Sequence, residues 1–413
     1  MIKRRRFYCS VNRGKNVDLK DYQMNMASSS AVPNLLGHPS AILTPDWAGS
    51  VLKAESTFHQ LSPYIGKLKS SIAGALVSQF TEPDDLIFDP FSGSGTVALE
   101  AWAAGRNVIA NDLSPYAALL TRAKLFPYPS LQAALEDIEK LSLEAAEDCA
   151  QIDLRQIPEW VRAFFHRETL REVLAWTHVF RKRRRWFLLA SLLGILHHQR
   201  PGFLSFPSSH TVPYLRLKAF PPAEFPQLYE YRSLRDRLEA KIKRAFRRVP
   251  ELDSTLERVC YAQSAHLLSP KTMVDAIITS PPYMRQLDYA RDNRLRLWFL
   301  GVDDPNALDQ TISPRKDAFL KLMRKCFIRW RTVLKPNGYC VLVVGDGSSQ
   351  VQGANLPEII SHIATDMVGG YVHVLDHTEA IPNERRVRRG LTGSTSETIV
   401  ILRNDPSNAR SGA

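Results

Sequence analysis

Paired cysteines, long apolar segments and a lysine-containing phosphate loop are all missing from this sequence of 413 residues. The five cysteines are scattered and form no CxxC pair, so neither a disulfide framework nor a zinc cluster is expected. The most apolar stretch, Trp186 to Leu196, is far shorter than the roughly 20 residues that span a bilayer. The basic amino terminus has no apolar core behind it, which argues against a secretory signal. With 44% hydrophobic and 23% charged residues, the composition predicts a packed, intracellular globular protein.

Positive charge is in excess and unevenly distributed. Lys and Arg number 54 against 42 Asp and Glu, a formal net charge of +12. Between Arg155 and Pro250 there are 20 basic and 7 acidic residues, so this block carries the whole imbalance. Such a block predicts a polyanionic partner, because Lys and Arg displace counterions from phosphates. The alternative is a solvated helical face. The run from Arg181 to Arg185 favours a partner, since an apolar helix follows it directly.

Strand-like and helix-like segments alternate along much of the chain and predict an α/β fold. Between about residues 129 and 256 the strand signal disappears and helical periodicity takes over, as in Leu234, Leu238, Ile242 and Phe246. An amphipathic helix is expected over residues 62–80. Helices should separate the first five strands, which predicts a mostly parallel, Rossmann-like seven-stranded sheet with a large helical insertion. The expected strands are 86–89, 107–111, 258–261, 274–279, 339–344, 372–375 and 397–402.

A glycine turn follows the first of these strands. The sequence Asp89-Pro-Phe-Ser-Gly-Ser-Gly-Thr96 ends a strand and opens a helix, so Gly93 and Gly95 permit close backbone approach to a ligand near free N–H donors. Asp112 ends the next strand, where a carboxylate can accept both hydroxyls of a ribose. This pairing predicts a nucleoside-type cofactor. No Lys follows Gly95, which disfavours a nucleotide triphosphatase. The alternative is a plain strand-to-helix connection.

A second turn, Thr279-Ser280-Pro281-Pro282-Tyr283, follows a buried strand at the same carboxyl edge. Two prolines make it rigid, and because proline has no N–H the local carbonyls are left as acceptors. Acceptors of this kind suit an exocyclic amino group, and the neighbouring Tyr can stack on the ring that carries it. The alternative is a rigid turn without chemistry.

The two turns together resemble those of the S-adenosylmethionine-dependent amino-methyltransferases of DNA. That family pairs a D-P-F-x-G-S-G-T motif with a [DNS]-P-P-[YFW] motif, complete here at Asp89–Thr96 and Ser280–Tyr283. The Ser form looks most like the N4-cytosine branch, whereas Asp or Asn would lean toward N6-adenine. The likeness covers roughly residues 57–125 and 258–402. It implies a methyltransferase sheet, S-adenosylmethionine as cofactor and double-stranded DNA as partner.

The resemblance also implies roles for individual residues. The segment from Phe58 to Phe80 is similar to the one that closes over the cofactor's methionine end. An acidic residue near the cofactor adenine is usual after the third strand, where either Gln263 or Ser264 would take its place in this chain. The catalytic set is Ser280, Pro281, Pro282 and Tyr283, with amine protons bound by the Ser280 side chain and the Pro281 carbonyl and the flipped base stacked on Tyr283. The cofactor-binding set is Tyr64, Lys67, Asp89, Pro90, Phe91, Ser92, Gly93, Gly95, Thr96, Asn111, Asp112, Leu113, Gln263 and Ser264.

No separate target-recognition domain follows the core, so the basic insertion is the candidate for DNA reading. The expected DNA contacts are Arg181, Lys182, Arg183, Arg184, Arg185, Arg291 and Arg294, although the charged stretch around Arg291 could equally be an internal ion-pair network. No metal site is expected, since His197 and His198 have no third ligand at zinc spacing. The expected organisation is an arm (1–50), a cofactor half (51–128), the insertion (129–256), a catalytic half (257–405) and a tail (406–413).

The sequence thus predicts methylation of DNA at cytosine N4 in a specific sequence, as in a restriction-modification or epigenetic methylase with a possible cognate endonuclease. A cytoplasmic, nucleoid-associated location would follow in a prokaryote. Three alternatives stay open: adenine N6 as the target, an RNA methyltransferase, and a non-catalytic DNA-binding scaffold.

Overall fold

The computed structural model describes residues 55–197, 203–209, 213–282, 289–312, 315–345, 355–381 and 396–409. The expected arm at residues 1–50 and Tyr283 lie outside these ranges. Within them, no helix combines the length and the apolar character needed to cross a membrane.

The described residues form a seven-stranded sheet in the order β3-β2-β1-β4-β5-β7-β6. The first five strands pair in parallel, and β7 is antiparallel to both β5 and β6. From β1 the chain proceeds outward through β2 to β3 and then returns to place β4 on the other side of β1. Ligands of open α/β sheets bind where the order reverses in this way, here between β1 and β4. The strands are β1 (Leu86–Asp89), β2 (Asn107–Asn111), β3 (Arg258–Tyr261), β4 (Val274–Thr279), β5 (Leu334–Gly345), β6 (Gly369–Ala380) and β7 (Ser396–Ala409).

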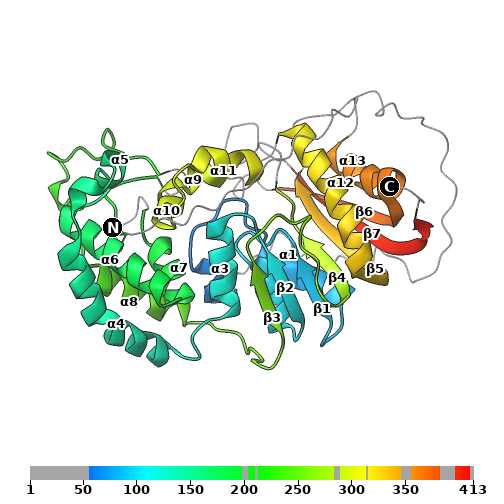
Figure 1. The fold of residues 1–413 in the computed structure, drawn as a ribbon, viewed down its shortest axis with the longest axis horizontal. Coiled ribbons are helices and arrows are strands. Elements are labelled where there is room, and N and C mark those ends of the chain that lie inside the picture. The colour runs from blue at the N-terminus through cyan, green and yellow to red at the C-terminus, as the bar shows by residue number, and fades with distance from the viewer. Residues whose placement is uncertain are drawn as a thin grey trace. The chain divides into compact units, whose positions relative to one another are not determined.

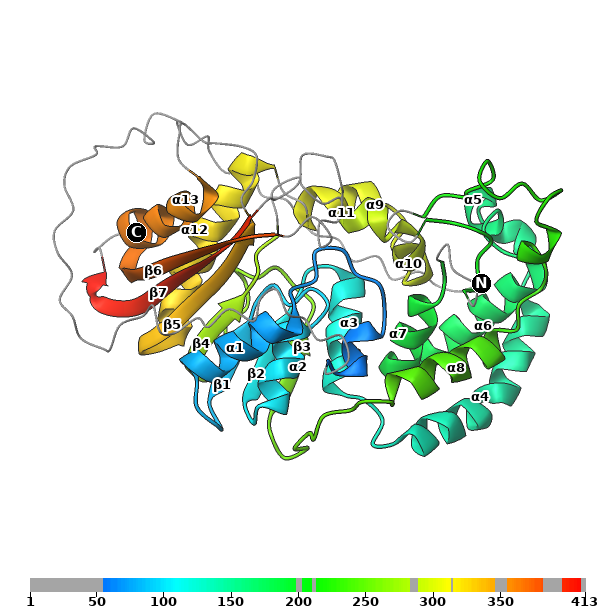
Figure 2. The same ribbon diagram turned by 180° about the vertical axis from the view of Figure 1, so that it is seen from behind.

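Helices cover the two faces of the sheet differently. On one face lie α1 (Ser70–Phe80), α2 (Thr96–Ala103) and α3 (Pro115–Leu125), which stand in front of the sheet in Figure 2. On the other face lie α12 (Lys316–Val333) and α13 (Leu356–His362), followed by a π-helical turn at Ile363–Val368 (Figure 1). The sheet therefore separates two apolar cores.

The stretch between β2 and β3 is helical. It contains α4 (Leu131–Gln151), α5 (Glu159–Arg162), α6 (Arg167–Lys182), α7 (Trp186–Gly194) and α8 (Leu234–Ala245). Its core is continuous with that of the first sheet face. Phe58, which precedes α1, packs edge-on against Phe187 of α7 and Phe246 beyond α8, with ring centroids 5.6 and 5.5 Å apart. These helices are thus anchored directly to the segment that precedes α1.

Three helices follow β4 and precede α12: α9 (Tyr289–Asp292), α10 (Arg294–Phe299) and α11 (Pro305–Ile312). In Figures 1 and 2 they run above α3 and α7, between α5 on one side and α12 on the other.

Two expectations about helices are wrong. The helix expected over residues 62–80 begins only at Ser70, because Ser62 and Pro63 start an irregular segment in which Gly66 has a φ of +73°. No helix separates β3 from β4, where residues 262–273 form turns that include Pro270. Because no helix follows β3, the side chains of Val259 and Tyr261 remain exposed.

The strands confirm the expected fold. The bounds of β1 to β4 coincide with the expected strands, whereas β5, β6 and β7 are longer. Strands β1, β2 and β4 are apolar and buried along most of their length and are easily located, while β6 and β7 continue their pairing into polar residues at their ends.

Candidate active site

The glycine turn after β1 is held in a conformation that requires glycine. Gly93 and Gly95 have φ values of +51° and +73°, and the Gly95 N–H donates to the Ser92 carbonyl at 2.7 Å. A Cβ on Gly95 would lie 2.8 Å from the backbone of Thr121 in α3. The turn therefore packs closely on α3 while it opens α2 at Thr96.

Asp112, directly after β2, closes the turn from the neighbouring strand. Its Oδ2 accepts the N–H of Gly93 and its Oδ1 accepts the N–H of Ser114, both at 2.8 Å. Burial raises the pKa of Asp112 to about 6, although these two hydrogen bonds oppose the shift. Each carboxylate oxygen retains a lone pair, so Asp112 can still accept hydroxyl protons from a ligand.

The Asn111 side chain forms hydrogen bonds to the backbone around the site. Its Nδ2 donates to the carbonyls of Pro90 and Gln263, both at 3.0 Å, and its Oδ1 accepts the Gln263 N–H at 3.2 Å. This side chain ties the ends of β1, β2 and β3 together. Neither Asn111 nor Gln263 lines the pocket described below.

The end of β4 meets the end of β1 through buried hydrogen bonds. The Thr279 hydroxyl donates to Asp89 Oδ1 at 2.7 Å and accepts the Phe91 N–H at 3.1 Å. Burial raises the pKa of Asp89 to about 7, and the bond from Thr279 opposes that rise. Next to it, the Ser280 hydroxyl donates to the Val343 carbonyl of β5 at 2.9 Å. Thr279 thus joins the two sequence motifs in space.

A cavity of about 260 Å³ lies at this reversal of the strand order. It brings together most of the predicted residues of both motifs. The predicted residues that line it are Tyr64, Lys67, Asp89, Pro90, Phe91, Ser92, Gly93, Thr96, Asp112, Leu113, Ser264, Ser280 and Pro282. Gly95, Asn111, Gln263 and Pro281 do not line it, and Tyr283 lies outside the described residues.

Other lining residues were not predicted from the sequence. Tyr289 stacks on Tyr64, with ring centroids 6.2 Å apart, and His266 shares a hydrogen bond of 2.8 Å with Ser264. Burial, and then Lys325 and Arg329, lower the pKa of His266. The one sequence signal for His266 as a cavity residue is its position a few residues after the third expected strand. The full set is Gly66, Leu68, Ser94, Val97, Ser114, Ala265, His266, Tyr289, Thr311, Ile312, Ala318 and Leu322.

Lys67 connects the cavity to a buried charged network behind it. Its Nζ donates to the His59 carbonyl at 3.1 Å, and the His59 ring lies 2.6 Å from Glu100 and 3.4 Å from Lys124. Burial strongly lowers the pKa of Lys124 and raises that of Glu100 to about 7. The network holds the segment before α1 against α2 and α3.

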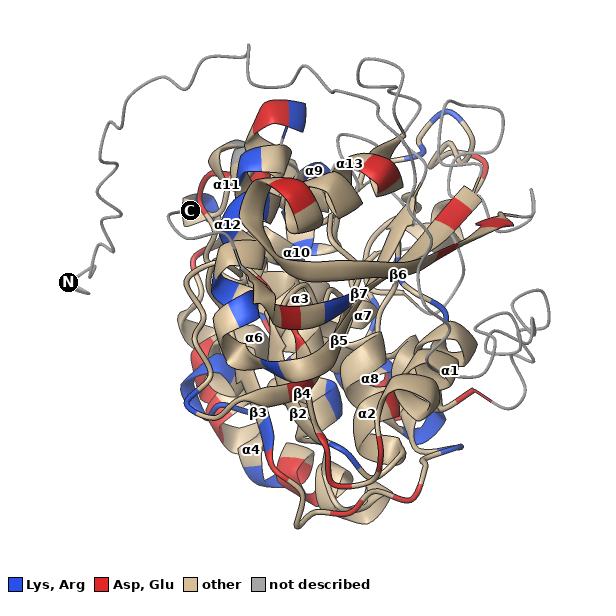
Figure 3. Cartoon of the chain, turned by 90° about the vertical axis from the view of Figure 1, so that its right-hand side faces the viewer, with Lys and Arg blue, Asp and Glu red and all other residues tan. Residues whose placement is uncertain are grey.

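The predicted DNA-binding arginines are distributed between internal pairs and the surface. Lys182 and Arg183 both bind Glu144 of α4, at 2.6 and 2.8 Å, and Arg185 binds Asp137 at 2.7 Å. Acidic and basic residues are correspondingly intermingled in Figure 3. Arg184 is exposed, as is Arg291 on α9. The Arg294 side chain donates to the Pro213 carbonyl at 2.8 Å.

No group of three or more His, Cys, Asp or Glu side chains could hold a metal ion in the part of the chain that the structure describes. The cavity instead suits an organic cation that carries a diol: two carboxylates, Asp89 and Asp112, line it beside a glycine turn. S-adenosylmethionine has these features, with its sulfonium, ammonium and ribose groups.

The strand order, the glycine turn after β1 and the acidic residue after β2 define the fold of S-adenosylmethionine-dependent methyltransferases. Residues 70–122 match the family model N6_N4_Mtase, described as DNA methylase. Over this segment the chain is similar to the N6/N4 DNA methylases.

Two curated proteins and one solved structure illustrate what the chain is similar to. Over 83 residues the chain is 34% identical to type II methyltransferase M.MjaII of Methanocaldococcus jannaschii, covering 20% of this chain and 14% of the relative. Over 277 residues it is 24% identical to type II methyltransferase M.BsoBI of Geobacillus stearothermophilus, covering 60% and 53%. The chain thus spans about half or less of these curated relatives. TrmN from Thermus thermophilus superposes with a TM-score of 0.35 and 13% identity, over 84% of this chain and 52% of that one.

Proposed function

We propose that this chain is a DNA methyltransferase that transfers a methyl group from S-adenosylmethionine to the N4 amine of a flipped cytosine in a specific DNA sequence. The matched DNA methylase segment and the two type II relatives support DNA as the substrate. The assignment to cytosine N4 depends on Ser280.

The state of the Ser280 hydroxyl supports transfer to an exocyclic amine of either cytosine or adenine, and the serine form of the motif is what favours cytosine. The hydroxyl proton is used in the bond to the Val343 carbonyl, so toward the cavity the oxygen offers lone pairs. A lone pair accepts a proton from an exocyclic amine, which is the group to be methylated. The same hydroxyl would not satisfy a carbonyl acceptor at that position.

The remaining residues have roles in orientation. S-adenosylmethionine, when bound, supplies an electrophilic methyl group. A hydrogen bond from the amine to Ser280, which lines the cavity, would aim the nitrogen lone pair, because the conjugated amine is a poor nucleophile in its planar form. Gly93, Asp112 and Ser264 would position the cofactor, and Tyr283 would stack on the base. No covalent intermediate on the protein is required.

The DNA-binding role of the helical stretch between β2 and β3 belongs to the same proposal. Its exposed cations, together with Arg291 of α9, would contact phosphates and so place the target base. A cognate endonuclease is compatible with the type II relatives.

Product identification tests the proposed reaction. The purified protein is incubated with mixed-sequence duplex DNA and methyl-labelled S-adenosylmethionine, and the digested nucleosides are identified by mass. Label in N4-methylcytosine is expected. Label in N6-methyladenine would support methyl transfer to an amine and would show that cytosine is the wrong base. Label found only in RNA would show that DNA is not the substrate. The absence of any label would favour a non-catalytic scaffold.

Ser280→Ala tests the residue that carries the assignment. We expect turnover to fall about 10²-fold with an unchanged dissociation constant for S-adenosylmethionine, because a positioned polar group acts mainly on the reacting nitrogen. Full activity of Ser280→Ala would refute the role of this hydroxyl.

A further inference from the structure

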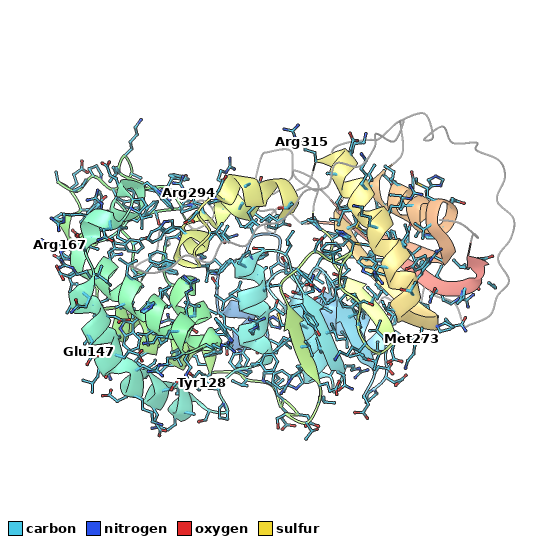
Figure 4. All side chains as sticks on the ribbon, in the orientation of Figure 1. Tyr128, Glu147, Arg167, Met273, Arg294 and Arg315 are labelled. Carbon is cyan, nitrogen blue, oxygen red and sulfur yellow. The ribbon has the colours of Figure 1, made fainter. Side chains whose placement is uncertain are left out.

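One wall of the cavity at the methyl-transfer site is aromatic. Tyr64, from the segment before α1, and Tyr289, at the start of α9, both line the cavity. Their rings stack, with centroids 6.2 Å apart and planes inclined by 27°. In Figure 4 the yellow helices α9 and α11 lie between the labelled Arg294 and Arg315. We call Tyr64 and Tyr289 the tyrosine pair; one precedes the glycine turn in the chain and the other follows the second motif.

The tyrosine pair lies beside the part of the cavity that would hold a ribose. A Cβ on Gly93 would be 3.5 Å from Cε1 of Tyr64, so the Tyr64 ring packs against the glycine turn. The N–H of the same glycine donates to Asp112 Oδ2 at 2.8 Å. Asp112 is the carboxylate that can accept the ribose hydroxyls. An aromatic face is therefore adjacent to the group that holds the ribose.

A buried layer supports the tyrosine pair from behind. The Tyr116 ring of α3 lies 6.2 Å from the Tyr64 ring, and the Tyr116 hydroxyl shares a hydrogen bond with Ser62. The Arg296 guanidinium of α10 lies 5.4 Å from the centre of the Tyr116 ring, and its Nε donates to the Leu193 carbonyl at 3.0 Å. Tyr116 and Arg296 are both fully buried. Because this layer is packed, the aromatic wall is in place before a ligand binds.

A tyrosine face has a chemical preference that matters at this position. The sulfur of S-adenosylmethionine is a positively charged sulfonium, joined to the ribose through one methylene group, and after methyl transfer it is a neutral thioether. The electron-rich face of a tyrosine ring attracts a cation and has no comparable attraction for a neutral group. Burial, and then Asp112, Tyr289 and Tyr116, raise the pKa of Tyr64 well above its usual value, so the phenol stays neutral. The wall thus attracts positive charge through its ring faces.

We propose that the tyrosine pair recognises the positive charge of the cofactor's sulfonium, so that the site binds S-adenosylmethionine in preference to the S-adenosylhomocysteine that remains after transfer. Asp89 and Asp112 favour the cation too, but only when ionised, whereas the rings act at any pH at which they are neutral. The inference rests on the proposed function for methyl transfer and is independent of which base receives the methyl group. It gives Tyr289, which neither motif contains, a role in selecting the cofactor over the product.

Tyr289→Leu tests the proposal, because leucine is apolar and has no aromatic face. Calorimetry on the full chain at pH 8, without DNA, gives the dissociation constants of S-adenosylmethionine and S-adenosylhomocysteine. We expect the ratio of the S-adenosylhomocysteine constant to the S-adenosylmethionine constant to fall about fivefold below that of the wild type, as for one lost cation–π contact. Tyr289→Phe keeps the ring and should keep the wild-type ratio. A ratio is insensitive to damage that weakens both ligands equally.

Leu322→Ala is the matched control. Leu322 lines the same cavity from α12, so its truncation should weaken both ligands to a similar extent and leave the ratio unchanged. A second series keeps the ring in place: phenylalanine carrying one, two or three ring fluorines is introduced at Tyr289, and each fluorine makes the ring less attractive to a cation. The ratio should fall with each added fluorine.

Three results would overturn the role of the tyrosine pair. These are a wild-type ratio in Tyr289→Leu, a ratio that does not depend on the number of fluorines, and an equal fall of the ratio in Leu322→Ala. The last result would show that any loss of packing in the cavity reduces the preference for the cation.

Binding and methylation are separate readings, so the two proposals can fail separately. If the wild-type protein methylates DNA and the Tyr289 variants keep its ratio, the role of the tyrosine pair is wrong and the proposed function stands. If the wild-type protein methylates no DNA, the proposed function is wrong, while calorimetry still reports whether the pair distinguishes the charged ligand from the neutral one. A wild-type protein that binds neither ligand would contradict both proposals.

Discussion

Thr279→Val is the substitution that most directly tests how the two halves of the site are joined. Its hydroxyl donates to the buried Asp89 carboxylate at 2.7 Å and accepts the Phe91 N–H at 3.1 Å. Valine has a similar shape and can form neither bond. Two buried polar groups lose their partner, at about 1–3 kcal/mol each, so we expect a loss of about 2–6 kcal/mol in the free energy of unfolding.

The loss should depend on pH through Asp89. Burial raises the pKa of Asp89 from its usual value of 3.8 to about 7 in the folded protein. The folded state therefore holds this proton more tightly than the unfolded state, and the stability gained from the protonated carboxyl is lost as pH rises from about 4 toward 7. Without the Thr279 donor this pKa rises further, and the loss continues to higher pH. Thr279→Val should therefore be more destabilising at pH 8, where the carboxylate is ionised, than at pH 6.

Urea denaturation at the two pH values, followed by titration with S-adenosylmethionine, measures these effects. Thr279→Ser keeps the hydroxyl and should restore both stability and cofactor affinity. Equal stability of Thr279→Val and wild type at pH 8, or a larger loss at pH 6, would refute this account of the junction.

Two further predictions concern the cofactor turn. The dissociation constant for S-adenosylmethionine should fall as pH rises from 5 to 8, because a cationic ligand binds better once Asp112 and Asp89, with pKa values of about 6 and about 7, are ionised. Calorimetry should show a flatter dependence of this constant on pH for Asp112→Asn. A constant that does not change with pH in the wild-type protein would contradict the assignment. Gly95→Ala should cost about 2–4 kcal/mol, since it adds a clash with Thr121 to the strain of a positive φ, whereas Gly105→Ala, with a φ of +80° and open space around it, should cost about 1 kcal/mol. Equal melting temperatures for the two variants would show that the turn does not pack as described.

Much of the sheet and the centre of the site could be predicted from the sequence. Short strands buried on both faces leave continuous apolar runs, and their ends carry the turn residues that define the site. The start of α1 could not be predicted, because Leu68, which continues the apolar spacing of the helix backwards, packs into the core from an irregular segment that ends at Lys69. Local periodicity does not report such long-range packing.

The cavity walls that come from segments far apart in the chain could not be predicted from the sequence either. Ser280 was identified by its motif, but the Val343 carbonyl that fixes its proton belongs to a strand 63 residues further along. Likewise Asn111 and Gln263 were expected at the ligand, whereas the structure uses them to tie strand ends together. Motifs indicate which residues gather at a site, and only the packing separates those that face the ligand from those that hold the frame.

The basic block from Arg155 to Pro250 shows why the net charge of a segment overstates the positive charge that is free to bind a polyanion. Counted from Arg155 to Pro250 the excess is +13, but over residues 129–256, with 21 basic and 16 acidic residues, it is only +5. The difference lies mainly in α4, whose Glu144 and Asp137 bind Lys182, Arg183 and Arg185. Ion pairs of this kind produce only a weak electrostatic field at a distant phosphate, because the two charges cancel. A cation without a carboxylate partner attracts an anionic ligand more strongly. If the chain binds DNA as proposed, recognition should therefore depend on a few cations placed like Arg181, which forms no ion pair with a carboxylate of the described residues, and neutralising Arg183 should weaken binding much less than neutralising Arg181.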